Sequence, residues 1–427
     1  MAESILQVPH TLPAESLSES FFTKSPTDLR FKVILSFILS ITNKLIINLY
    51  FQNTRYDVIY PRNSIQNSKT ILFEFPIPTG PSFYLLDKVL LSLKMQLVKR
   101  DDTKIDDGTQ VAPINLPLTS VISNLSVELN DVPITPQSSN YNYKAYLDTL
   151  LNYDSIVKDN LLQVSGYFED VHDQMDATSD DNLGFALRRD LFSTEVDGVR
   201  VYHTEGIHFI GNLNLDFTSP CKPILNGVKI KITMTLADND FILMTPSNDD
   251  IVYKLTSCNL ICPIATLTDD MYSDVIKGLE KEKKAFYNYL RRELININIA
   301  AGTLNYTTDT LFSGGKLPAK MILAFVKTEA YQGNRTLNPY NFFNNDLDTG
   351  IMIKKVNVTL NGSPIDGFEL PINDEKKKAD YLRLHLMTGL TKVPYSNSIS
   401  LDMFNGGYVY ILYMLIYYFN LQYNNLL

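Results

Sequence analysis

The sequence predicts an all-β protein made of two similar β-sandwiches, and three observations lead to this prediction. Segments that alternate apolar and polar residues are separated by Gly, Pro and Asn, as is typical of strands joined by turns. A segment from Leu125 to Ile134 returns in altered form from Val356 to Ile365. The length of 427 residues exceeds what one hydrophobic core usually supports. We therefore expect two sandwiches with short inserted helices.

The repeated segment has the pattern of a β-hairpin. In both copies an alternating strand ends at Asn-Asp or Asn-Gly, the strongest short-range hairpin signal, and Pro-Ile follows. Internal duplication and convergence on a common hairpin pattern both explain such a repeat. The copies share five identical positions: Val127 and Val358, Leu129 and Leu360, Asn130 and Asn361, Pro133 and Pro364, Ile134 and Ile365.

Alternation of period two predicts individual strands. One runs from Val89 to Leu97, with apolar residues at every second position and Ser92, Lys94 and Gln96 on the opposite face. Another runs from Val228 to Leu236, directly after an Asn226-Gly227 turn, and its lysines would keep the outer face soluble. Further strands are predicted at Ile71 to Phe75, Glu293 to Ile299, Met321 to Val326 and Ile351 to Leu360.

Two segments instead have the period of a helix. The first is amphipathic, with apolar residues at the spacing i, i+3, i+4 and i+7. The second spans about Asp269 to Tyr289 and, midway along the chain, would connect the two sandwiches. The apolar residues of the first are Tyr143, Tyr146, Leu147, Leu150 and Leu151.

Composition excludes several classes of function. A net charge of -9 gives no basic field for nucleic acid, so no direct nucleic-acid binding is expected. Three cysteines are too few for a disulfide framework and favour a reducing compartment. Two apolar stretches, Val33 to Phe51 and Tyr408 to Phe419, are interrupted or too short for a spanning helix. No membrane span is therefore expected.

Several strings occur in the order found in one protein family. The run from Tyr141 to Tyr153 resembles the Tyr-Pro-Tyr-Arg-Ala-Tyr helix motif of the major capsid proteins of Polinton (Maverick) elements and related adintoviruses, with Asn142 where Pro is common. The resemblance spans about Thr54 to Tyr410. It continues through Val111 to Asn115, Ile224 to Ile230, Gly278 to Lys281, Ala301 to Leu304, Leu311 to Phe312, Leu317 to Pro318 and Asn338 to Phe342.

This resemblance implies a double jelly roll, two side-by-side β-sandwiches, of which three copies form a pseudo-hexagonal capsomer. On that basis we divide the chain into an N-terminal extension with an atypical insertion (1–53), a first jelly roll (54–266), a connector helix (267–284) and a second jelly roll (285–427). The family implies a homotrimer with lateral capsomer contacts, a penton-type minor capsid protein as partner, and no cofactor. It also implies location in a virion capsid assembled in the host cytoplasm or nucleus.

Two regions depart from the family. The stretch from Phe31 to Phe51 resembles an insertion before the first strand. After Tyr410 the chain no longer follows the family, so we expect the last strands of the second jelly roll to be incomplete. Missing strands would expose a sheet edge.

Two groups of residues suggest metal sites, and each also has a structural explanation. His172 lies among acidic residues, which suggests a divalent cation, but such sites need defined ligand spacing and a solvated loop is favoured. Cys258 and Cys262, with Cys221, suggest zinc, but no second Cys/His pair accompanies them and buried thiols are favoured. The acidic residues are Glu169, Asp170, Asp173, Asp176, Asp180 and Asp181.

Other motifs are similarly weak. His203 and His208 suggest a cupin-like metal site, but that chemistry needs a spacing of i and i+2 on one strand face. The turn from Ser313 to Lys316 is too short to hold phosphate. The basic run from Lys376 to Lys378 favours a solvated loop over a nucleic-acid contact. We assign no catalytic, cofactor-binding or metal residues.

Three functions therefore compete. The first is a structural capsid subunit with no enzymatic activity. The second is a ligand- or carbohydrate-binding β-sandwich without catalysis, which would have an aromatic-lined cleft. The third is a cupin-like enzyme, which would bind metal through His203 or His208.

Overall fold

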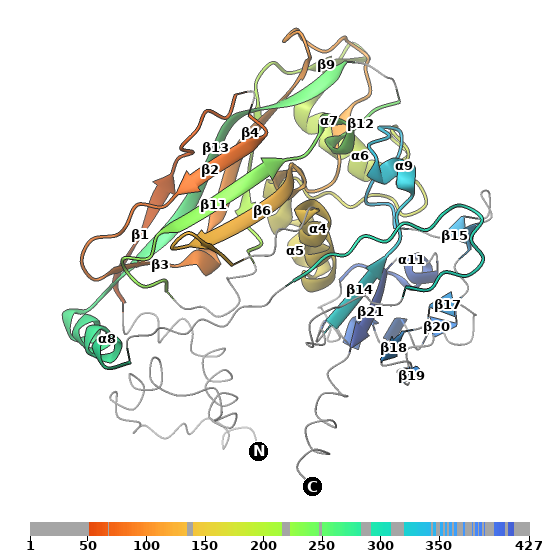
Figure 1. The fold of residues 1–427 in the computed structure, drawn as a ribbon. Coiled ribbons are helices and arrows are strands. Elements are labelled where there is room, and N and C mark those ends of the chain that lie inside the picture. The colour runs from red at the N-terminus through yellow and green to blue at the C-terminus, as the bar shows by residue number, and fades with distance from the viewer. Residues whose placement is uncertain are drawn as a thin grey trace, which may run out of the picture.

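The computed structural model describes residues 51–66, 68–134, 140–215, 223–246, 250–282, 292–308 and 320–342, together with shorter pieces between 345 and 413. Two antiparallel sheets face each other in the first half (Figure 1). The first has the order β1 (Phe51–Ile59), β13 (Ile251–Leu267), β4 (Leu90–Lys99) and β10 (Ile207–Asn212), and β3 (Ser82–Tyr84) also pairs with β13. The second has the order β2 (Thr70–Glu74), β11 (Ile230–Leu236), β6 (Ile122–Leu129) and β7 (Val132–Pro133).

The core of this sandwich comes from alternate residues of the facing sheets. The apolar face predicted for β4 is buried, and so is the apolar face predicted for β11. Their polar faces are only partly covered, because they point away from the core. The strands predicted around residues 71–75, 89–97 and 228–236 are therefore confirmed. The buried residues are Leu91, Leu93, Met95 and Leu97 in β4, and Ile230, Ile232 and Met234 in β11.

Helices and short ladders fill the connections of this sandwich. The amphipathic helix is confirmed as α4 (Tyr141–Asn152), which contacts β6. Helical structure is more extensive than an all-β prediction allows. The other elements are η1 (Leu86–Lys88), β5 (Ala112–Pro113), α3 (Pro117–Ser120), α5 (Ser155–Asp159), η2 (Leu161–Ser165), α6 (Leu183–Phe192), β8 (Ser193–Val196), β9 (Val199–Tyr202), α7 (Asn239–Ile242) and β12 (Leu243–Met244).

The second predicted helix begins where the sequence predicts. It is α8 (Asp269–Glu282), and its predicted continuation to Tyr289 lies outside the described residues. Val275 of α8 packs against Phe83 and Leu267 at the end of the sandwich. The helix therefore starts directly from the last strand of the first sandwich (Figure 1).

The second half contains shorter ladders. The strand predicted near Met321 is confirmed as β14 (Lys320–Ala324), which pairs with β21 (Val409–Tyr413). Within the described residues of this half, each ladder has two strands. The remaining elements are α9 (Thr328–Tyr331), β15 (Asn345–Asp346), β16 (Ile351–Met352), β17 (Lys355–Val356), β18 (Thr359–Leu360), β19 (Ser363–Pro364), β20 (Leu370–Pro371) and α11 (Leu401–Asn405).

One predicted strand of the second half is wrong, and another is confirmed in part. The segment from Glu293 to Ile299 has no regular secondary structure, and Ile295, Ile297 and Ile299 are exposed. Alternation alone does not make a strand, because a strand also needs a ladder partner. The described residues between Ile351 and Leu360 include β16, β17 and β18, so extended structure is confirmed there, and each of the three has a different partner.

The repeated hairpin is confirmed, with the same register in both copies. In the first copy Glu128 pairs with Pro133, and in the second copy Thr359 pairs with Pro364. The shift is 231 residues (359 − 128), and the second pair of each hairpin follows the same shift. Val127 and Val358, which correspond under this shift, are both buried. The two segments therefore share strand pairing and the direction of their core face.

The turn before β11 depends on a left-handed glycine. Val228 N–H donates to Leu225 O at 3.4 Å, and Gly227 has a φ of 87°. Asn226 has no positive φ, so the pair fits a type II turn. Asn226 Nδ2 donates to Gly80 O at 2.7 Å and ties the turn to the segment before β3.

Gly227→Ala is expected to lower the free energy of unfolding by about 1 kcal/mol, because a Cβ disfavours positive φ. Open space surrounds Gly227, so backbone conformation alone sets this cost. Gly278→Ala in α8 is the matched control, since it also has open space but is helical. It should stabilise by roughly 0.5–1 kcal/mol. Urea unfolding measures the free energy of unfolding of both variants. Equal changes of the same sign in the two variants would contradict the turn assignment.

Candidate functional site

An aromatic cluster joins the two halves of the chain. Tyr143 and Tyr146 come from α4, and Tyr340 and Phe342 come from the second half. The rings of Tyr146 and Tyr340 stack with centroids 3.9 Å apart and planes at 2°. Tyr143 meets Tyr340 edge to face, with centroids 5.6 Å apart. All four side chains are buried, so these aromatic residues pack a core and line no open cleft.

The hydroxyl group of Tyr340 is also satisfied within this core. Tyr340 OH and Ser120 Oγ are 2.7 Å apart, and Ser120 belongs to α3. Burial raises the pKa of Tyr340 above its ordinary value, so the phenol stays neutral. A neutral, hydrogen-bonded hydroxyl can be buried at little cost. The contact therefore fixes the position of residue 340 relative to the first sandwich.

A buried ion pair lies beside the aromatic cluster. Arg188 of α6 donates from Nη2 to Asp170 Oδ1 at 2.7 Å, and both side chains are almost completely buried. The same guanidinium donates to Pro113 O at 2.9 Å and to Phe168 O at 3.0 Å. A charge buried in this way is tolerated because it is paired and each of its three nitrogens donates a hydrogen bond.

The second half takes part in this network through Asn338. Its Nδ2 donates to the second oxygen of Asp170 at 3.2 Å, and its N–H donates to Asp176 Oδ1 at 2.8 Å. Asn341 Nδ2 donates to Asp176 Oδ2 at 3.0 Å. Two aspartates of the loop before α6 therefore hold the segment that carries Tyr340. We call residues 338–342, from Asn338 to Phe342, the clamp segment.

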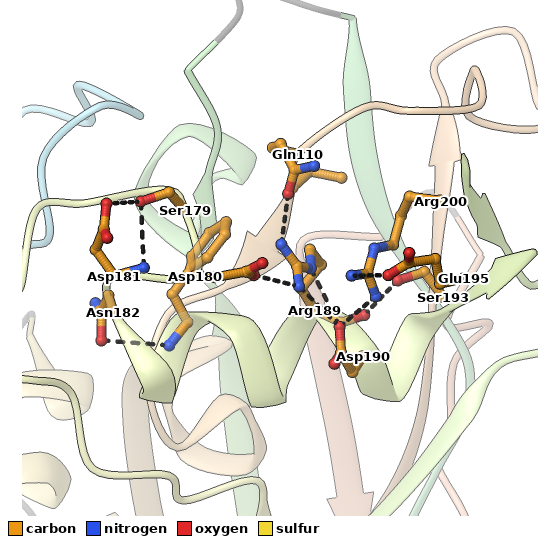
Figure 2. A network of polar contacts seen from close by, with 12 residues as sticks. Gln110, Ser179, Asp180, Asp181, Asn182, Arg189, Asp190, Ser193, Glu195 and Arg200 are labelled. Carbon is orange, nitrogen blue, oxygen red and sulfur yellow. Dashed lines mark hydrogen bonds and ion pairs between the residues drawn. The ribbon is translucent and has the colours of Figure 1, made fainter. Parts of the chain in front are cut away.

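A second polar network surrounds the buried Arg189 of α6, and Figure 2 shows it. Arg189 donates to Gln110 Oε1 at 2.6 Å, to Asp180 Oδ1 at 2.7 Å and to Asp190 Oδ1 at 3.1 Å. Arg200 donates to the same oxygen of Asp190 at 2.5 Å. These contacts join α6 to β9 and to the segment before β5. The network therefore holds these elements together and has a structural role.

The acidic cluster around His172 is thus divided among separate partners. Asp170 binds Arg188, Asp176 binds the clamp segment, and Asp180 binds Arg189. The described residues contain no group of three or more His, Cys, Asp or Glu that could hold a metal ion. The interpretation as a solvated loop is wrong for Asp170, which is buried because it neutralises Arg188.

The two described cysteines are buried free thiols in β13, as the sequence favoured. Burial raises the pKa of Cys258 to about 12 and also raises the pKa of Cys262. A protonated thiol is a poor zinc ligand and a poor nucleophile. Cys221 lies outside the described residues.

The candidate histidines bind different hydroxyls. His208 Nε2 lies 2.8 Å from Ser92 Oγ of β4, and His203 Nε2 lies 2.9 Å from Thr194 Oγ1 of β8. Each imidazole ring therefore has its own hydroxyl partner, and the two partners belong to different strands. The turn from Ser313 to Lys316 lies outside the described residues, and of the basic run only Lys378, which is exposed, is described.

The comparisons with known proteins give distant similarities. No protein-family model matches the chain. An uncharacterized protein of Caenorhabditis elegans is 25% identical over 364 residues, which cover 83% of this chain and 81% of that protein. This match is longer than one predicted jelly roll. Within the described residues, no helix is long and apolar enough to cross a membrane.

The structure is similar to chains of viral capsids. A chain in the Sputnik virophage structure has a TM-score of 0.37 at 13% identity, over 52% of this chain and 49% of the virophage chain. The Faustovirus major capsid protein has a TM-score of 0.31 at 10% identity, over 53% and 56%. The mavirus major capsid protein has 0.28 at 12% identity, over 63% and 49%. The chain thus spans about half the length of these proteins.

Tyr340→Leu is expected to lower the free energy of unfolding by about 1–3 kcal/mol, because it keeps apolar volume but removes the ring stack. Tyr340→Phe keeps the ring and should cost at most about 1 kcal/mol, since Ser120 Oγ also donates to Asn115 O. Urea unfolding of the two variants tests the order. Equal losses would show that stacking on Tyr146 contributes nothing.

In a Cys221→Ser variant, Cys258 and Cys262 should resist iodoacetamide at pH 8 in the native state and react in urea, because burial keeps both thiols protonated. Mass spectrometry counts the added groups. An unfolded thiol ionises near 9.0 and folded Cys258 near 12, so the unfolded state loses more protons between these values. Stability should therefore fall as the pH rises through this window. Fast alkylation of the native variant would contradict the burial.

Proposed function

We propose that this chain is a major capsid protein: a structural, non-catalytic double jelly roll whose activity is self-association into trimeric, pseudo-hexagonal capsomers of a virus or virus-derived mobile element. One observation carries the proposal. Two strings that resemble capsid proteins of Polinton elements, Tyr141 to Tyr153 and Asn338 to Phe342, meet in one buried aromatic cluster. Strings far apart in sequence that pack together are expected if the resemblance reflects a shared fold.

The strand order of the first sandwich supports this assignment. Its eight principal strands in chain order are β1, β2, β4, β6, β7, β10, β11 and β13. Numbered one to eight, they form sheets of order 1-8-3-6 and 2-7-4-5. Eight strands that alternate between two sheets in this manner wind as a jelly roll. The hairpin of equal register in the second half supports a duplicated partner for it.

Duplication of the sandwich and threefold association of the chain together would give a capsomer with nearly sixfold symmetry. A trimer of a chain with two similar sandwiches presents six similar wedges, and closed symmetry makes the same contact three times. Permanent interfaces of this kind bury roughly 2,000 Å² or more. We further propose a penton-type minor capsid protein as partner and the virion as location.

An exposed apolar face on the first strand is a candidate contact with another copy. Tyr56 is 66% exposed, Val58 is 45% exposed, and Tyr60, directly after β1, is 67% exposed. The three alternate with Asp57 and the buried Ile59, so they share the outer face. Within the part of the chain that the structure describes, β1 is also an edge strand, because its one ladder partner there is β13. Apolar residues on an open edge favour association.

Light scattering of the full chain after size exclusion tests the proposal, and three times the monomer mass is expected. Tyr56→Lys combined with Tyr60→Lys should shift this species toward monomer, because two charges would enter an apolar contact. Leu161→Lys is the matched control, since Leu161 is 62% exposed but lies on η2, away from β1. A wild-type chain that stays monomeric at every accessible concentration would overturn the proposal.

A further inference from the structure

A lysine buried at the junction of the two halves has no part in the proposed capsid contacts. Lys158 of α5 is 0% exposed. Its Nζ donates to Leu150 O at 2.7 Å, near the end of α4, and to Asn397 O at 2.6 Å, in the segment before α11. Asn397 is also 0% exposed. A lysine and an asparagine that are 239 residues apart in sequence are therefore fixed against each other in the core.

The side-chain amide of Asn397 is arranged unusually. Its Oδ1 accepts a hydrogen bond from Ile399 N–H at 3.2 Å. Within the described part of the chain, its Nδ2 is buried without a hydrogen-bond partner. Ser398, with a φ of 65°, makes the turn that brings the Ile399 amide to this oxygen. A buried amide nitrogen left without a partner is costly, and such exceptions call for a chemical explanation.

The surroundings favour the nucleophilic form of the lysine. Burial lowers the pKa of Lys158 to about 8, while the negative charge of Glu169 acts in the opposite direction. Much of Glu169 reaches solvent, yet desolvation of its carboxyl group raises its pKa, and Lys158 opposes that rise. Desolvation of the two groups therefore favours proton transfer from the ammonium to the carboxylate, and their mutual attraction opposes it. A neutral amine in a desolvated site is a nucleophile.

We propose that Lys158 and Asn397 form an intramolecular isopeptide bond that covalently joins the two halves of the chain. Lys158 Nζ forms a bond to Asn397 Cγ, and the bond from Cγ to Nδ2 breaks. The proton lost by Nζ passes to the departing nitrogen, with Glu169 as the proton carrier, and ammonia leaves. Nothing is oxidised or reduced, and no further reactant is needed.

The contacts supply what this reaction requires. Negative charge develops on Asn397 Oδ1 during attack, and the Ile399 N–H already donates to that oxygen. The two carbonyl acceptors hold Nζ beside Asn397, which replaces a bimolecular encounter by a fixed arrangement. Leu151 and Ile399 are each 1% exposed, so the site holds little water that could compete for the amide. The Nδ2 without a partner is the group that leaves.

Mass spectrometry of the intact full chain tests the inference. We expect a mass lower than that of the sequence by one ammonia, and a tryptic product in which the peptides of Lys158 and Asn397 are joined. Lys158→Met and Asn397→Ala should both restore the full mass, whereas Lys254→Met, at an exposed lysine, should retain the loss. Intact mass equal to the sequence, with both peptides linear, would overturn the inference.

A succinimide at Asn397 would also release ammonia, so the variants must separate the two products. A succinimide needs no lysine and would persist in Lys158→Met, which would contradict the isopeptide bond. Because the wild-type peptide map decides the question alone, a variant that fails to fold does not prevent the test. Glu169→Gln should slow the appearance of the linked peptide, since the proton carrier is removed. The proposed bond lies within one chain, so mass spectrometry detects it equally in a monomer and in a trimer. Absence of the bond and absence of trimers are therefore separate results.

Discussion

The packing of Tyr340 against Tyr146 is the interaction on which the arrangement of this chain depends. The ring of Tyr340 enters the core formed by α3, α4 and α7, and Asn338 continues the contact into the pair of Arg188 and Asp170. Removing one partner of a buried pair costs roughly 3–5 kcal/mol, because the other charge is left without compensation. The clamp segment thus contributes Tyr340 and Phe342 to the hydrophobic core of the first half.

This arrangement explains why the second half can consist of short ladders and still have a defined place. Its described strands form pairs, and a pair of strands has little stability alone. The clamp segment, the contact of Lys158 with Asn397 and the pair of Arg335 with Asp240 are among the contacts that attach it to the sandwich. Buried residues from both halves accordingly share one large hydrophobic core.

The features that the sequence predicted well are those with a local signal. Strand β11 and helix α4 follow from periodicity, and the hairpin at β6 and β7 follows from Asn130-Asp131, both with positive φ. The segment from Glu293 to Ile299 was predicted wrongly, because alternation states which residues share a face but not whether another strand is available.

The polar residues of the site were harder to predict. Helix α6 has an amphipathic pattern that could have been found, but the burial of Arg188 depends on Asp170 and on Asn338, which lies 168 residues from Asp170. Asp170 stands among exposed acidic residues and has no distinguishing neighbour in sequence. Lys158 likewise has the local sequence of a surface lysine. Arg188, Asp170 and Lys158 are buried because of contacts with residues far away in sequence. The spacing of residues along the chain does not indicate such contacts.

Hydrogen exchange of the native full chain measures this coupling directly. Tyr340 N–H donates to Asn338 Oδ1 inside the clamp segment, and Thr233 belongs to β11 in the centre of the second sheet. If the clamp segment is part of the core of the first sandwich, these two amides should exchange with the same free energy of opening. Exchange at Tyr340 that is orders of magnitude faster than at Thr233 would show that the halves separate while the sandwich stays folded, and would contradict the account.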